Sequence, residues 1–205
     1  MPSTLSIVKF LLFYSIYLWF IPPIRQYKQR LFYYFLFLAF ADPIERLIIH
    51  YNISMPSNFY STFSYILLAA ILWDKKSFKT NYYLIGGGLA LFIFSTLTGN
   101  WGISLHHFVP FNFTYSVDKL LFITIQIIIL FLFLKKFILD FVSYSKINVF
   151  QLVLVFYQLT LVSKIALILM STPNAIAFFI ITNAVEIAFG LYFSIFREDK
   201  AKFPY

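Results

Sequence analysis

Five ionisable side chains lie within stretches of sequence that are otherwise strongly apolar: Asp42, Glu45, Arg46, Lys164 and Glu186. On a helix, Asp42, Glu45 and Arg46 share one face at i, i+3 and i+4 spacing, so Asp42 can pair with Arg46. Ionisable residues within membrane spans are rare and usually bind a ligand, an ion or a proton. A salt-bridge network that only fixes helix packing is the alternative. The sequence leaves both interpretations open.

Three histidines and an aspartate form a second group of candidates, because imidazole and carboxylate groups are zinc ligands. They are His50, His106, His107 and Asp118, and all four fall on the same predicted side of the membrane. Adjacent histidines often cannot both reach one metal, and no His-Glu-x-x-His spacing is present. We therefore interpret the histidines as interfacial side chains bonded to backbone or lipid, and predict no metal and no cofactor. Zinc binding is the alternative.

The composition requires lipid as the solvent for much of this chain. Of its 205 residues, 61% are hydrophobic and 12% are charged, whereas soluble domains average about 25% charged residues. Segments long and apolar enough to span a bilayer run over about 5–21, 31–50, 59–73, 82–98, 118–134, 148–170 and 174–196. The predicted fold class is all-α, a polytopic membrane protein whose seven helices form one bundle and a single domain over residues 1–205.

The second predicted span must pass through the charged stretch. Its purely apolar part, residues 31–41, covers only half of a hydrocarbon core about 30 Å thick, because a helix rises about 1.5 Å per residue. Continuation to residue 50 places Asp42 near mid-membrane. A half-helix that turns back at Asp42-Pro43 is the alternative, and it would require a cavity lined by protein. Depth along the spans puts Lys164 in the outer half, at the level of Glu45 and Arg46. It puts Glu186 near the middle, at the level of Asp42. We expect these residues to line one polar cluster.

Basic residues predict the orientation. The connections after the first, third and fifth spans, together with the C-terminal tail, hold twelve of the sixteen basic residues: Arg25, Lys28, Arg30, Lys75, Lys76, Lys79, Lys135, Lys136, Lys146, Arg197, Lys200 and Lys202. The other connections hold none, apart from Lys119 just inside the fifth span. The positive-inside rule then places the C-terminus in the cytoplasm and the N-terminus outside a plasma or inner membrane. Topology thus explains the net charge of +8, and nucleic acid is not an expected partner.

Catalytic motifs are missing from the sequence. There is no cysteine, no Gly-x-Ser-x-Gly elbow and no Walker loop. The favoured prediction is a non-catalytic sensor or accessory subunit of a membrane complex, whose partners are lipids, another membrane protein or a second copy. One alternative is a transporter or channel for a small ion, a proton or an anion that uses the same polar cluster. Another is an intramembrane lipid-modifying enzyme that uses the histidines and acids of the outer side.

Overall fold

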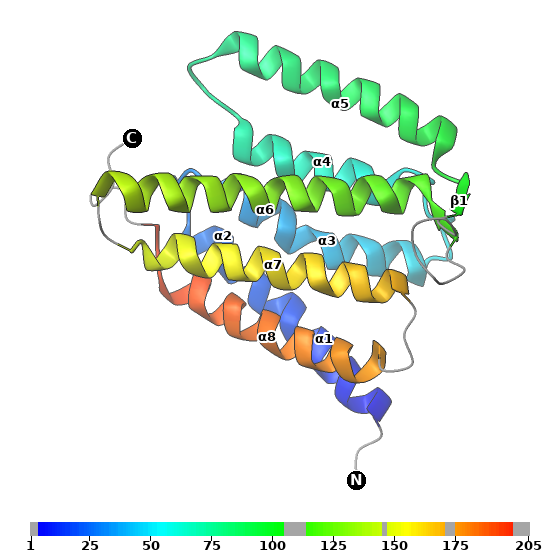
Figure 1. The fold of residues 1–205 in the computed structure, drawn as a ribbon. Helices are drawn as coiled ribbons and strands as arrows, with labels where there is room; N and C mark the ends of the chain where they lie inside the picture. Colours follow the sequence, from blue (N-terminus) through cyan, green and yellow to red (C-terminus); the bar gives the residue numbers. More distant parts are fainter. Residues whose placement is uncertain (1–3, 105–113, 145–146, 171–174, 199–205) are drawn as a thin grey trace. The chain divides into compact units, whose positions relative to one another are not determined.

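The computed structural model of the chain describes residues 4–104, 114–144, 147–170 and 175–198 (Figure 1). This part contains seven longer helices: α1 (Thr4–Trp19), α3 (Phe32–His50), α4 (Phe59–Leu72), α5 (Phe78–Thr98), α6 (Val117–Tyr144), α7 (Val149–Met170) and α8 (Ala175–Ile195). A five-residue helix, α2 (Ile21–Arg25), follows α1. Two short antiparallel strands, β1 (Gly102–Ser104) and β2 (Thr114–Ser116), precede α6. The prediction of an all-α fold is confirmed, with this small hairpin as an addition.

Within the described residues, three helices are long and apolar enough to cross a membrane. They are α5, α6 and residues Val149–Ala166 of α7, while α4 and residues Ile180–Ile195 of α8 are shorter apolar helices. Large apolar side chains are exposed on them, with Leu97 70% and Phe131 63% exposed, whereas the polar side chains of Gln158 and Asn183 are buried. Apolar groups outside and polar groups inside are the pattern of a protein solvated by lipid. These features suggest a multi-pass membrane protein.

Helix α3 runs from Phe32 to His50 with Pro43 inside it. The half-helix that turns back at Asp42-Pro43 is therefore excluded, and the charged stretch lies within a continuous helix. Pro43 carries no amide hydrogen, so the carbonyl of Ala39 loses its usual partner at this point. The helix predicted over residues 31–50 is confirmed, with its end at His50, whereas its crossing of the membrane stays a prediction.

Two predicted helix boundaries are wrong. Helix α6 continues through Lys135 and Lys136 to Tyr144 instead of stopping at residue 134, because lysine favours helix and only the hydrocarbon excludes its charge. Helix α5 begins at Phe78 instead of residue 82, and the hydroxyl of Ser77 caps it by accepting the amide of Thr80 at 3.3 Å. Charged residues mark where the apolar segments end in the sequence, but the helices continue beyond them.

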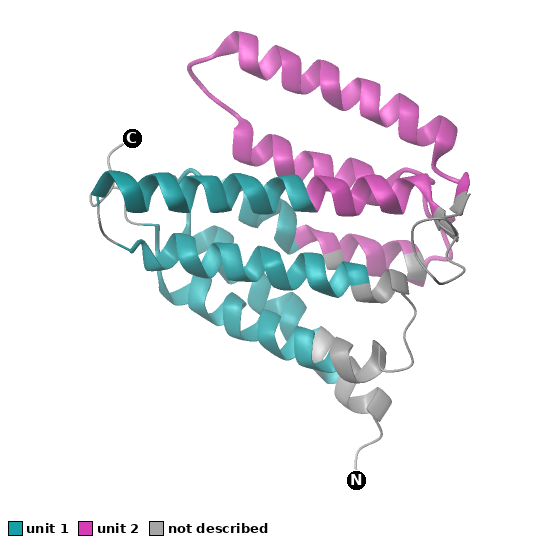
Figure 2. Ribbon diagram, viewed as in Figure 1, with its two compact units in different colours: residues 1–39, 127–205 teal, residues 40–126 magenta. Residues whose placement is uncertain are grey.

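The helices form two compact units, and the boundary between the units falls within α3 and within α6 (Figure 2). Unit 1 comprises residues 1–39 and 127–205. In unit 1, α8 packs against α1, α2 and α7. A Cβ atom at Gly190 would lie 3.0 Å from Leu18 Cδ2 and 3.3 Å from Trp19 Nε1, so this glycine permits the close approach of α1. The single domain predicted over the whole chain stays a prediction.

Unit 2 comprises residues 40–126, and within it α4 packs against α5. Tyr65 of α4 lies against two glycines of α5. A Cβ atom at Gly88 would approach Tyr65 Cε1 to 2.8 Å, and one at Gly87 would approach the Tyr65 hydroxyl to 2.9 Å. The same hydroxyl donates a hydrogen bond to the carbonyl of Leu84 at 2.7 Å. The glycine run of α5 is thus a packing surface for an aromatic ring.

Candidate functional site

Lys164 and Glu186 form an ion pair between α7 and α8. The Nζ atom of Lys164 lies 2.7 Å from Oε2 of Glu186, and it donates a second hydrogen bond to Oδ1 of Asn183 at 3.3 Å. The two charged side chains are 16% and 11% exposed. A pair this short and this shielded from water is a charge-assisted hydrogen bond, which is stronger than one between neutral groups.

The local sequence explains why these groups meet. Asn183 and Glu186 are three residues apart on α8, so both lie on the same helix face. This face is turned toward α7, because both side chains bond to Lys164. Lysine has a long, flexible side chain, so its ammonium can reach a partner at a different depth from its own Cα atom. Lys164 and Glu186, which we expected in one polar cluster, are therefore in direct contact in the structure.

Further polar side chains are buried in unit 1. The hydroxyl of Tyr34 on α3 donates to Oε1 of Gln158 on α7 at 3.0 Å, and both residues are fully buried. Thr182 and Gln151 are also buried, at 4% and 1% exposure. Uncharged polar groups of this kind hold helices together in lipid by hydrogen bonds. They belong to the same unit as the Lys164–Glu186 pair.

The remaining candidates of the charged stretch belong to unit 2. Glu45 is half-buried, and its Oε1 accepts a hydrogen bond from the hydroxyl of Tyr60 at 3.1 Å. Arg46 is exposed, and the side chain of Asp42 lies outside the described residues. The expected Asp42–Arg46 pair stays a prediction for this reason. The joining of all five charged residues in one cluster also stays a prediction, because the contacts described here lie within each unit.

Asp118, which the sequence offered as an alternative zinc ligand, accepts hydrogen bonds from backbone amides of α4 in the structure. Its carboxylate is 4% exposed. Oδ1 accepts the amide of Ser61 at 2.9 Å and Oδ2 accepts the amide of Tyr60 at 3.3 Å. These amides lie in the first turn of α4, where backbone donors have no partner within the helix and negative charge is favoured. Asp118 therefore caps a neighbouring helix, a role that no local sequence pattern predicts.

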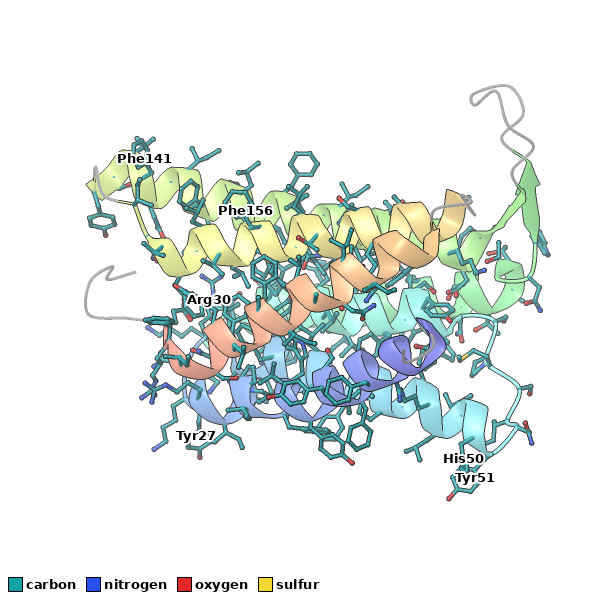
Figure 3. All side chains as sticks on the ribbon, turned by 90° about the horizontal axis from the view of Figure 1, so that it is seen from below. Tyr27, Arg30, His50, Tyr51, Phe141 and Phe156 are labelled. Carbon is teal, nitrogen blue, oxygen red and sulfur yellow. The ribbon has the colours of Figure 1, made fainter. Side chains whose placement is uncertain are left out.

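Of the three histidines in the zinc and lipid-enzyme alternatives, the structure describes only His50. His50 is exposed at the end of α3 beside Tyr51, with 5.1 Å between the ring centroids (Figure 3). His106 and His107 lie outside the described residues. Within the described part of the chain, no group of three or more His, Cys, Asp or Glu side chains is placed to hold a metal ion. Zinc binding by these residues stays an untested alternative.

A second polar cluster in unit 1 was not predicted. Gln26, which is fully buried, donates to the carbonyls of Phe196 at 2.8 Å and Phe193 at 3.3 Å, and it accepts the amide of Glu198 at 3.1 Å. The Glu198 carboxylate lies 3.9 Å from Nζ of Lys136. Gln26 follows a pair of prolines in an ordinary polar turn, and nothing in its neighbourhood marks it as buried.

The ammonium, carboxylate and amide groups of Lys164, Glu186 and Asn183 are of the kinds that bind ions and small polar molecules. The same groups can pass a proton between a carboxylate and an incoming ligand. Comparison of the chain with family models, with curated proteins and with solved structures found no match, so the geometry alone guides the functional interpretation.

Proposed function

We propose that the chain crosses the membrane seven times, with its N-terminus outside and its C-terminus in the cytoplasm, in a plasma or inner membrane. The support is the number of longer helices and the distribution of charge between them. Arg25, Lys28, Lys75 and Lys76 lie in connections on the side assigned to the cytoplasm. The connection between α3 and α4, assigned to the outside, holds no basic residue.

We further propose that the protein is a non-catalytic sensor or accessory subunit that binds a small polar ligand at the Lys164–Glu186 pair. The observation that carries this proposal is the 2.7 Å ion pair between two apolar helices. Removing two charges from water is costly, and well-packed apolar residues would stabilise the same helix contact at least as well. Binding of a ligand through an ammonium, a carboxylate and an amide would explain why charged residues stand at this helix contact.

Two double variants test this proposal in the full-length protein. Wild-type protein, purified in mild detergent, is examined by native mass spectrometry for bound small molecules and partner chains. The variant Lys164→Met/Glu186→Gln removes the charged pair with little change of volume. The matched control, Lys136→Met/Glu198→Gln, removes a different ion pair of unit 1. We expect a ligand or partner that is kept by the control and lost by the first variant. A wild-type protein that is a solitary, ligand-free monomer contradicts the proposal.

A second candidate function is transport of a proton or small ion. It is favoured by the same observation, because a titratable carboxylate that faces an ammonium within apolar helices is a common element of proton relays. Ion or proton flux into proteoliposomes is expected to fall to background in Glu186→Gln and to persist in Glu198→Gln. Undiminished flux in Glu186→Gln, or no flux in the wild type, counts against transport and leaves ligand binding as the function to test.

A further inference from the structure

Exposed basic side chains from three separate segments gather at one end of unit 1. They lie at the end of α2 and just after it, in the second half of α6 and just after α8: Arg25, Lys28, Arg30, Lys135 and Arg197. We call these five residues the basic patch. Tyr27 and Arg30 lie toward the same end of the unit in Figure 3. The positive-inside rule predicts basic residues at this end, but it does not predict how they are held.

Two arginines at this end donate hydrogen bonds to backbone carbonyls. Nε of Arg25 donates to the carbonyl of Ile195 at 3.1 Å, and Nη2 of Arg197 donates to the carbonyl of Tyr27 at 2.8 Å. A guanidinium has five N–H donors in a rigid fork that matches a phosphate. In the described part of the chain, the terminal nitrogens of Arg25 make no other hydrogen bond. Arg25 is therefore fixed in place and still has donors for an anion.

The acidic groups at this end are withdrawn from the surface. Glu198 is 4% exposed, and its carboxylate forms an ion pair with Nζ of Lys136 at 3.9 Å. Asp140 on α6 is half-buried. Among the described residues of this end, the exposed charged side chains are those of the basic patch. Among the side chains that the structure describes at this end, an approaching anion therefore meets mainly positive charge at the surface.

Apolar side chains are exposed beside the arginines. Ile24 is 74% exposed next to Arg25, and Ile195 and Phe196 are 60% and 52% exposed just before Arg197. Tyr27, whose ring suits the headgroup level of a bilayer, is 58% exposed. A free phosphate or a nucleic acid would use the arginines but not the apolar residues. A phospholipid uses both, through its headgroup phosphate and its acyl chains.

We propose that the basic patch binds an anionic phospholipid of the cytoplasmic leaflet, with Arg25 and Arg197 on the headgroup phosphate and Ile24 and Phe196 against the acyl chains. This inference rests on the membrane placement proposed above. It does not depend on ligand binding at Lys164 and Glu186, which are different residues of α7 and α8. A failure of either proposal therefore leaves the other standing.

The test is lipid retention by the full-length protein, measured by native mass spectrometry after purification with equal amounts of phosphatidylglycerol and phosphatidylcholine. We expect the wild type to retain phosphatidylglycerol about tenfold in excess. Arg25→Gln/Arg197→Gln should abolish this excess. The matched control, Lys75→Gln/Lys76→Gln, removes the same charge from the connection between α4 and α5 and should retain it. Equal retention of both lipids by the wild type, or equal loss in variant and control, overturns the proposal.

Two further variants separate a built site from general charge attraction. Arg25→Lys/Arg197→Lys keeps the charge and loses the planar fork, so retention should fall about threefold, whereas general attraction predicts no change. Lys28→Gln/Lys135→Gln leaves both backbone-bound arginines in place and should reduce retention even if the arginine variants do not fold. Displacement of the lipid by a millimolar excess of inorganic phosphate would assign the patch to a free anion and overturn the lipid assignment.

Discussion

The side-chain nitrogen of Gln26 lies 2.8 Å from the carbonyl oxygen of Phe196, so a residue that follows α2 closes the C-terminal end of α8. The last carbonyls of a helix have no partner within the helix. Gln26 supplies one donor to two of them, since it also reaches Phe193 at 3.3 Å. Its own oxygen accepts the amide of Glu198 at 3.1 Å, which fixes the chain beyond the helix.

Replacement of Gln26 by leucine should destabilise unit 1. Gln26 is 0% exposed, and its loss leaves buried carbonyls without a donor. Each such loss costs about 1–3 kcal/mol of the free energy of unfolding. Denaturant unfolding of the reconstituted protein measures the change. The exposed Asn100→Leu is the control, and a cost as small for Gln26→Leu as for this control would contradict the closure of α8 by Gln26.

The Lys164–Glu186 contact predicts strong coupling between the two residues. Lys164→Met or Glu186→Leu alone should lower the free energy of unfolding by about 1–3 kcal/mol, because each leaves one shielded charge without its partner. The double variant should recover most of this loss. A double-mutant cycle measured by unfolding in bicelles gives the coupling. Costs that simply add would show that the two side chains act independently.

The glycines of α5 predict opposite effects at neighbouring positions. Gly88→Ala would place a Cβ atom 2.8 Å from the Tyr65 ring, whereas a Cβ atom at Gly86 has nothing within 4 Å. Gly88→Ala should therefore displace Tyr65 and lower stability. Gly86→Ala should be neutral or stabilising by up to about 1 kcal/mol, because alanine favours helix. Thermal unfolding of both variants makes the comparison, and equal shifts would rule out this packing arrangement.

Asp118 should protect the first turn of α4. Asp118→Ala removes the acceptor of two backbone amides, and losing a helix cap costs about 0.5–2 kcal/mol. Hydrogen–deuterium exchange is expected to accelerate at the amides of Tyr60 and Ser61. Lys119→Ala changes the exposed neighbour on α6 and is the control. Unchanged exchange at both amides in Asp118→Ala would show that the carboxylate does not cap α4.

The proposed orientation can be tested directly, because the chain has no cysteine. Single cysteines at Asn52 and at Lys75 lie on opposite predicted sides of the membrane. In intact cells, an impermeant maleimide should label Asn52→Cys and should label Lys75→Cys only after the membrane is opened. The reverse pattern would invert the proposed topology, and labelling of both positions in intact cells would contradict a single membrane crossing between them.

Span length and charge were sufficient to predict that the charged stretch lies within a helix. The argument from length carried α3 through Pro43 because eleven apolar residues cannot cross a hydrocarbon core. The same reasoning failed at Lys135, where the helix leaves the apolar region without ending. Hydropathy reports where a chain can meet lipid. Backbone hydrogen bonds decide where a helix ends, and lysine does not break them.

The candidate site was predictable in its residues more than in its contacts. Lys164 and Glu186 stand out because each interrupts an apolar segment, although depth along the helices placed Lys164 nearer the outer side than Glu186. The hydrogen-bond partners of Asp118 and Gln26 come from distant segments of the chain. From the sequence alone, a polar residue that caps its own helix cannot be distinguished from one that caps another helix. Only the packing of the helices reveals which backbone amides and carbonyls such residues satisfy.

The chain order of the two units has a consequence for biosynthesis. Unit 2 is one continuous segment, so all its packing partners have been synthesised once residue 126 has left the ribosome. Unit 1 is discontinuous, and its first helix packs against its last. Helices α1 and α2 must therefore wait in the membrane or the insertion machinery until α8 arrives. Unit 1 can be completed only after synthesis reaches Glu198, whose amide bonds to Gln26.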